Sequence, residues 1–133
     1  IMRTGNSSDF TFQGGAAHIR RFHVRDLPPY FDTYLVPPGA NIKVDWEVIP
    51  DSAEVSVLEE KFWTSEDGEE GFETHEPMAP SPAPNVGRNI ISMLVADRLE
   101  CTLYAENECA DSKVERKLTF VVDHDVDGIV GVI

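Results

Sequence analysis

Polar and apolar residues alternate along residues 98–106, and this alternation limits the possible folds more than any other feature of the chain. The apolar positions are Leu99, Cys101, Leu103 and Ala105, and the polar ones are Arg98, Glu100, Thr102 and Glu106. A period of two is typical of a strand with one dry and one wet face. Residues 114–122 repeat the pattern after the polar segment 108–112. The two runs together predict an antiparallel hairpin.

Further short strands are predicted along the chain, each bounded by proline or glycine turn signals. They cover residues 18–25, 32–36, 42–48, 55–57 and 89–95. The last of these, residues 89–95, is almost continuously apolar and predicts a strand buried on both faces. About seven short strands without any helical periodicity predict an all-β fold, an antiparallel β-sandwich.

Residues 59–88 differ in character from the rest of the chain. A cluster of glutamates and one aspartate is followed by four prolines between Pro77 and Pro84. Like charge and proline both oppose strand packing. We therefore expect a long acidic, Pro-rich surface loop, with at most short edge strands at Phe62-Trp63 and Phe72-Glu73.

The length of 133 residues suits one domain with a single core. Residues 1–15 are polar and glycine-rich, and predict a flexible N-terminal tail. Residues 16–123 are expected to form the sandwich, and residues 124–133 an acidic C-terminal tail or linker to another module.

The net charge is −13, from 24 acidic and 11 basic residues. Such a surface repels phosphate backbones and anionic lipid, which excludes nucleic acid as an expected partner. No apolar run approaches the roughly 20 residues that span a bilayer, so membrane insertion is not expected either. The charge is compatible with a secreted or surface protein, with a cation-rich environment or with a basic partner. The alternative is that it only keeps the protein soluble.

The strand pattern resembles that of immunoglobulin-like domains over residues 18–122. The sixth strand of that family commonly reads Asp-x-Gly/Ala-x-Tyr-x-Cys-x-Ala-x-Asn, and Asp97, Ala105 and Asn107 match it. Cys101 stands at the position of the family's tyrosine, and Leu103 at that of its second core cysteine. The equivalent of the first core cysteine, seven residues after Gly39, is Trp46. Val57 falls about where the family's core tryptophan lies.

This resemblance implies an immunoglobulin-like sandwich without the inter-sheet disulfide, as in bacterial Ig-like modules and I-set-like relatives. Trp46 packed near Leu103 would then supply apolar contact area where a cystine otherwise lies. Of the chain's two cysteines, Cys101 is expected to point inward on its strand, and Cys109 lies at or near the predicted hairpin turn. They are either two free thiols, with Cys101 in the core, or a bridge across a distorted turn.

The only metal-binding pattern is Asp123-His124-Asp125-Val126-Asp127-Gly128. Asp123, Asp125 and Asp127 have the spacing of the first three carboxylates of a calcium loop, with glycine at the sixth position. The alternative is an acidic linker after the last strand. Calcium is therefore the only cofactor that the sequence suggests.

No nucleophile elbow, zinc-protease motif or phosphate loop occurs in the sequence, so we do not expect an enzyme. Five aromatic residues either form a platform for sugar or peptide, or they plug sheet edges and cover the core: Tyr30, Phe31, Tyr34, Phe62 and Trp63.

We therefore expect a non-catalytic Ig-like module of a secreted or cell-surface protein, located at the cell surface or outside the cell. It would serve in adhesion and recognition, or as a spacer between neighbouring domains. Recognition of a protein partner would use the loop 59–88 or an edge strand, the latter by strand addition. The alternative is a carbohydrate-binding module, aided by calcium, with a glycan as its ligand.

Overall fold

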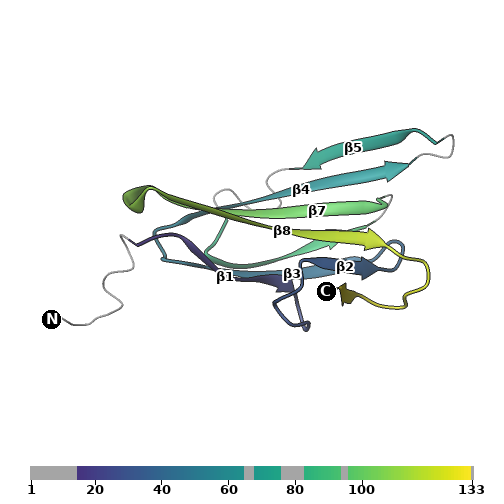
Figure 1. Ribbon diagram of the computed structural model, residues 1–133, viewed down its shortest axis with the longest axis horizontal. Helices are drawn as coiled ribbons and strands as arrows, with labels where there is room; N and C mark the ends of the chain where they lie inside the picture. Colours follow the sequence, from purple (N-terminus) through teal and green to yellow (C-terminus); the bar gives the residue numbers. More distant parts are fainter. Residues whose placement is uncertain (1–14, 65–67, 76–82, 94–95, 133) are drawn as a thin grey trace.

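The computed structural model of the chain describes residues 15–64, 68–75, 83–93 and 96–132, which contain strands and one short 3-10 helix (Figure 1). The elements in chain order are β1 (His18–Val24), β2 (Thr33–Val36), β3 (Asn41–Ile49), β4 (Glu54–Thr64), β5 (Glu70–His75), β6 (Val86–Ser92), β7 (Arg98–Asn107), η3 (Glu108–Ala110), β8 (Ser112–Val122) and β9 (Val130–Val132).

The strands form two sheets, which pack face to face as an all-β sandwich (Figure 1). The smaller sheet has the order β1-β3-β6, and the larger has the order β5-β4-β7-β8-β2-β9. Neighbouring strands are antiparallel except for β2 and β8, which run parallel with Thr33 opposite Thr119. The expected fold class is confirmed.

Alternation along the strands builds the core between the sheets. On β3, Ile42, Val44, Trp46 and Val48 are buried, and on β7 the same holds for Leu99, Cys101, Leu103 and Ala105. The predicted hairpin is β7, η3 and β8, paired antiparallel along its whole length. Each large apolar side chain that is fully buried in this way contributes about 1.5–3 kcal/mol relative to exposure.

Trp46 is fully buried, as expected, and it lies in the same core cluster as Leu103. Its Nε1–H donates a hydrogen bond of 2.8 Å to the carbonyl of Pro84. The indole therefore has its polar group satisfied inside the core, which a buried tryptophan needs.

The expected surface loop over residues 59–88 is wrong in part. β4 continues as far as Thr64, and β5 pairs with it antiparallel to make a hairpin, while β6 already begins at Val86. The charged residues are tolerated in the strand because Lys61 lies 3.6 Å from the carboxylate of Glu59 on the same face. Residues 65–67 and 76–82 lie outside the described part of the chain.

The expected strand at residues 89–95 is also displaced, and it is not buried on both faces. β6 spans Val86–Ser92 and lies at the border of the three-stranded sheet. Ile91 is fully buried, whereas Ile90 is 60% exposed. An apolar run does not reveal whether both faces of its sheet are covered.

The structure describes only parts of the two predicted tails. Of the predicted N-terminal tail, only Gly15 lies within the described residues. Within the segment predicted as an acidic tail or linker, Val130–Val132 form β9, which pairs antiparallel with β2. The acidic residues 123–127 form the connection between β8 and β9, and two valines with high strand propensity follow them.

Candidate functional site

The free border of the three-stranded sheet is formed by β6, and hydrogen-bond geometry shows which backbone groups point away from the sheet. The N–H of Val48 donates to the carbonyl of Asn85, and the N–H of Met93 donates to the carbonyl of Ala40, both at 2.8 Å. Residues of an antiparallel strand alternate between groups directed to the neighbour and groups directed away. Positions 85, 87, 89, 91 and 93 therefore face β3, while positions 86, 88, 90 and 92 direct their N–H and C=O groups outward.

The outward positions also carry the exposed side chains of the strand. Val86 is 61% exposed and Ile90 is 60% exposed, with the exposed Arg88 between them. The N–H of Ile90 is occupied by the Oδ1 of Asn89 at 2.8 Å. In the described part of the chain, no strand pairs with this side of β6. We call Val86, Arg88 and Ile90, with their backbone groups, the β6 edge.

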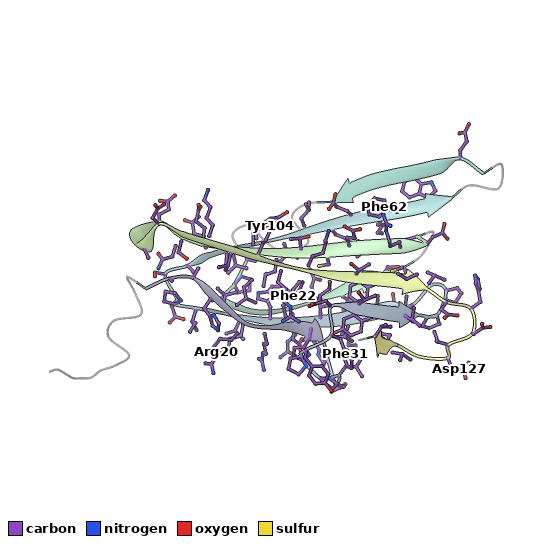
Figure 2. The ribbon with its side chains drawn as sticks, in the orientation of Figure 1. Arg20, Phe22, Phe31, Phe62, Tyr104 and Asp127 are labelled. Carbon is purple, nitrogen blue, oxygen red and sulfur yellow. The ribbon has the colours of Figure 1, made fainter. Side chains whose placement is uncertain are left out.

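The outer face of the three-stranded sheet is locally basic, although the whole chain is acidic. Its strands hold four of the 11 basic residues and only two of the 24 acidic ones. Figure 2 shows Arg20 on this face, directed away from the sandwich, and Phe22 between the sheets.

Both acids of this face already bind arginines. Arg25 binds Asp45 through Nη2 at 3.0 Å and Nε at 3.2 Å, and the hydrogen bond to Asp45 raises the pKa of Arg25. Arg20 and Arg21 lie 3.4 and 3.8 Å from the carboxylate of Glu47. Among the described residues, Arg88 has no ion pair.

A second surface feature is a hollow on the outer face of the six-stranded sheet. Tyr104, which is labelled in Figure 2, lines this hollow and is 38% exposed. The hollow has a volume of about 300 Å³ and is lined by residues of β4, β7 and β8, among them Glu54, Ser56, Tyr104, Glu106 and Lys113. Lys113 lies 3.2 Å from the carboxylate of Glu106. An aromatic ring thus stands beside a hydroxyl and two carboxylates.

The predicted aromatic platform is not assembled as one surface. Tyr34 is buried and stacks on Phe120, with ring centroids 5.3 Å apart. Phe62 lies under the guanidinium of Arg98 at 4.2 Å, and Trp63 lies against Gly71. Of the aromatic residues predicted for this platform, Tyr30 has the largest exposure given by the structure, at 66%.

The predicted calcium ligands lie in the connection between β8 and β9. The Oδ1 of Asp123 accepts the N–H of Asp125 at 2.8 Å, which is a turn interaction, and Asp127 is exposed near the end of this loop (Figure 2). Within the described residues, no group of three or more His, Cys, Asp or Glu side chains is arranged to hold a metal ion.

Cys101 is a buried thiol, and its pKa is raised by desolvation and by the nearby carboxylate of Glu59. A deprotonated, reactive sulfur is therefore disfavoured in the folded protein. Cys109 lies in η3, and its side chain is outside the described part.

Tyr104 and the β6 edge were not singled out from the sequence. For Tyr104 a signal exists, because it is an aromatic residue on the polar parity of β7, between Thr102 and Glu106. For β6 there is no such signal, since the position of a strand within its sheet depends on long-range pairing.

The two packed sheets define the class of this protein as an all-β sandwich. No family model matches the chain, and no curated protein matches it. Among solved structures, it is similar to the one described as "Crystal structure of the C-terminal domain of wzt", with 16% sequence identity and a TM-score of 0.37. That similarity covers 89% of this chain and 81% of the other, and concerns the fold alone. No helix in the described residues has the length and apolarity to cross a membrane.

Proposed function

We propose that the chain is a non-catalytic, immunoglobulin-like recognition module of a secreted or cell-surface protein, and that it binds a protein partner by strand addition at the β6 edge. The observation that carries the proposal is that β6 combines outward backbone groups with the exposed side chains of Val86 and Ile90. In strand addition, backbone hydrogen bonds supply affinity and alternate side chains supply specificity.

The strand order supports the Ig-like part of the proposal. Immunoglobulin sandwiches pair strands A, B, E and D in one sheet and C, F and G in the other, with C′ beside C in some types. Here β1, β3 and β6 take the places of A, B and E, and β5, β4, β7 and β8 those of C′, C, F and G. Among the described residues, no strand takes the place of D beside β6.

Open strand borders are usually protected in monomeric proteins by charge, proline, bulges or a covering element. The β6 edge carries one charge, Arg88, between two exposed β-branched side chains. This composition suits a surface that another extended segment covers in the working protein.

The proposal is tested with a displayed library of extended ten-residue peptides. Wild-type domain should enrich a subset of these peptides, and Arg88→Ala should retain binding to many of them. Arg88→Pro should lose all of them, because proline removes the outward N–H of residue 88 without removing a hydrogen bond to β3. Failure of the wild type to enrich any peptide, or retention of binding by Arg88→Pro with its fold intact, contradicts the proposal.

A second candidate function is carbohydrate binding, and the hollow beside Tyr104 is the observation that favours it. Its volume of about 300 Å³ is at the lower end for small-ligand sites. A sugar ring can stack on an aromatic face while its hydroxyl groups bond to carboxylates such as Glu54. A glycan array checks this: a hit should disappear in Tyr104→Ala and persist in Tyr30→Ala, an exposed tyrosine outside the hollow. An array without hits sinks the idea.

A further inference from the structure

The geometry of the β6 edge points to the chemical class of its partner. We propose that the added strand presents an acidic side chain opposite Arg88, between two apolar side chains opposite Val86 and Ile90. The recognised pattern is thus apolar-x-acidic-x-apolar in an extended segment. This inference rests on the proposed function and adds specificity to it.

The spacing of the pattern follows from the pleat of the strand. The side chains at positions 86, 88 and 90 lie on the outer face, and those at 87, 89 and 91 on the other. In a paired strand, residues directly opposite share a face, and the next residue on that face is two positions away. A partner strand in register therefore meets Val86, Arg88 and Ile90 with every second side chain.

The acidic residue proposed for the middle of the partner strand follows from the ion pairs on the outer face of the three-stranded sheet. Asp45 lies opposite Arg88 on β3, but its carboxylate is bound by Arg25 in three hydrogen bonds of 3.0–3.2 Å. Glu47 is shared by two arginines. Lys43, opposite Ile90 on β3, adds a further positive charge to the same face. An incoming carboxylate thus meets uncompensated positive charge.

A second copy of this chain is a poorer occupant than an acidic segment. Two copies of the β6 edge paired antiparallel in full register, with Val86 of each opposite Ile90 of the other, would bring one Arg88 opposite the other. Like charges directly opposite each other destabilise a strand pair. The charge at the centre of the β6 edge therefore favours a different chain with a carboxylate at that point.

The test uses two nine-residue peptides with blocked ends. In both, threonine alternates with the residues whose side chains would lie on the same face as Val86, Arg88 and Ile90. At the three central positions of that face, one peptide has valine, glutamate and valine, and the other has valine, lysine and valine. Binding to the isotopically labelled domain is followed by NMR at about physiological ionic strength, where surface charges more than about 8 Å apart are largely screened. The amides of Val86, Arg88 and Ile90 report the site.

The glutamate peptide should bind roughly five- to tenfold more tightly than the lysine peptide, since an attractive cross-strand pair replaces a repulsive one. Arg88→Glu should reverse this order. Lys113→Glu is the matched control, because it makes the same change in net charge on the other sheet, where Lys113 is 80% exposed. It should leave the preference unchanged.

Each other outcome has a distinct meaning. If both peptides bind equally and Arg88→Pro abolishes both, strand addition stands and the acidic specificity is wrong. If neither peptide binds at millimolar concentration, strand addition itself is contradicted. If sedimentation shows a dimer of the domain that Arg88→Pro dissolves, a second copy occupies the edge and this inference is overturned.

Discussion

The indole of Trp46 lies directly against Gly87, its antiparallel partner on β6. A Cβ atom added to Gly87 would stand 2.3 Å from the six-membered ring of that indole. The buried tryptophan of β3 therefore requires a residue without a side chain on the neighbouring strand. The same contact links the core to the strand that carries the proposed binding edge.

Gly87→Ala is expected to lower the free energy of unfolding by about 1–3 kcal/mol, because the new methyl group overpacks a core that cannot move away easily. Denaturant unfolding followed by fluorescence measures this change. Gly128→Ala is the matched control, since a Cβ there meets nothing within 4 Å. It should alter stability by no more than about 0.5 kcal/mol. Equal effects of the two substitutions would contradict the packing described for Trp46.

Tyr34→Phe is expected to lower stability at neutral pH by about 0.5–1.5 kcal/mol. The hydroxyl donates to the carbonyl of Phe31 at 3.3 Å and accepts the N–H of Val24 at 3.4 Å, and both bonds would be lost. Urea unfolding of the variant and of the wild type at pH 7 gives the difference.

The same residue should contribute to alkaline unfolding. Burial raises the pKa of Tyr34 above its ordinary value of 10.0. Its contribution is therefore complete below about pH 10 and is lost as the pH rises through the higher folded-state pKa. Tyr34→Phe should lose less stability than the wild type above pH 10, whereas Tyr30→Phe, at an exposed site, should decline as the wild type does. Parallel curves for all three proteins would rule this out.

Cys101 is expected to resist alkylation by iodoacetamide in the folded protein at pH 8. The thiol is fully buried and its pKa is raised, so both access and thiolate formation are suppressed. Mass spectrometry of the peptide containing Cys101 measures the labelled fraction with and without denaturant. Labelling of the native protein at the denatured rate would show that Cys101 is not part of a closed core.

Calcium is expected to leave the melting temperature unchanged. The carboxylate of Asp123 is engaged in a turn with the N–H of Asp125, and no metal-holding group occurs among the described residues. Scanning calorimetry in millimolar calcium and in chelator provides the comparison, with Asp123→Ala as the variant. A rise in melting temperature with calcium that Asp123→Ala abolishes would restore the sequence-based calcium site.

Local periodicity predicted most of the sandwich. The alternation of apolar residues in β3 and β7 identifies eight buried positions correctly. It is a strong signal because a shift of one residue would move every apolar side chain of the strand to the solvent face. The hairpin of β7 and β8 is also local, so its turn residues and its flanking runs can be seen together in the sequence.

The errors arise where an outcome depends on distant residues. Glu59 and Lys61 look like loop residues, but β4 extends over both because it pairs there with β5 and β7. Ile90 looks like a core residue, but it is exposed because its side chain lies on the outer face of the three-stranded sheet. The β6 edge is therefore visible only once the order of the strands is known.

The parallel pairing of β2 and β8 has a consequence for how the protein is made. Thr33 pairs with Thr119 on one side and with Val132 on the other, so this early strand is held between two late ones. Such distant pairings delay folding. During synthesis on the ribosome, β2 has no partner strand until almost the whole domain has emerged. In this interval the nascent chain most needs chaperones to protect it from aggregation.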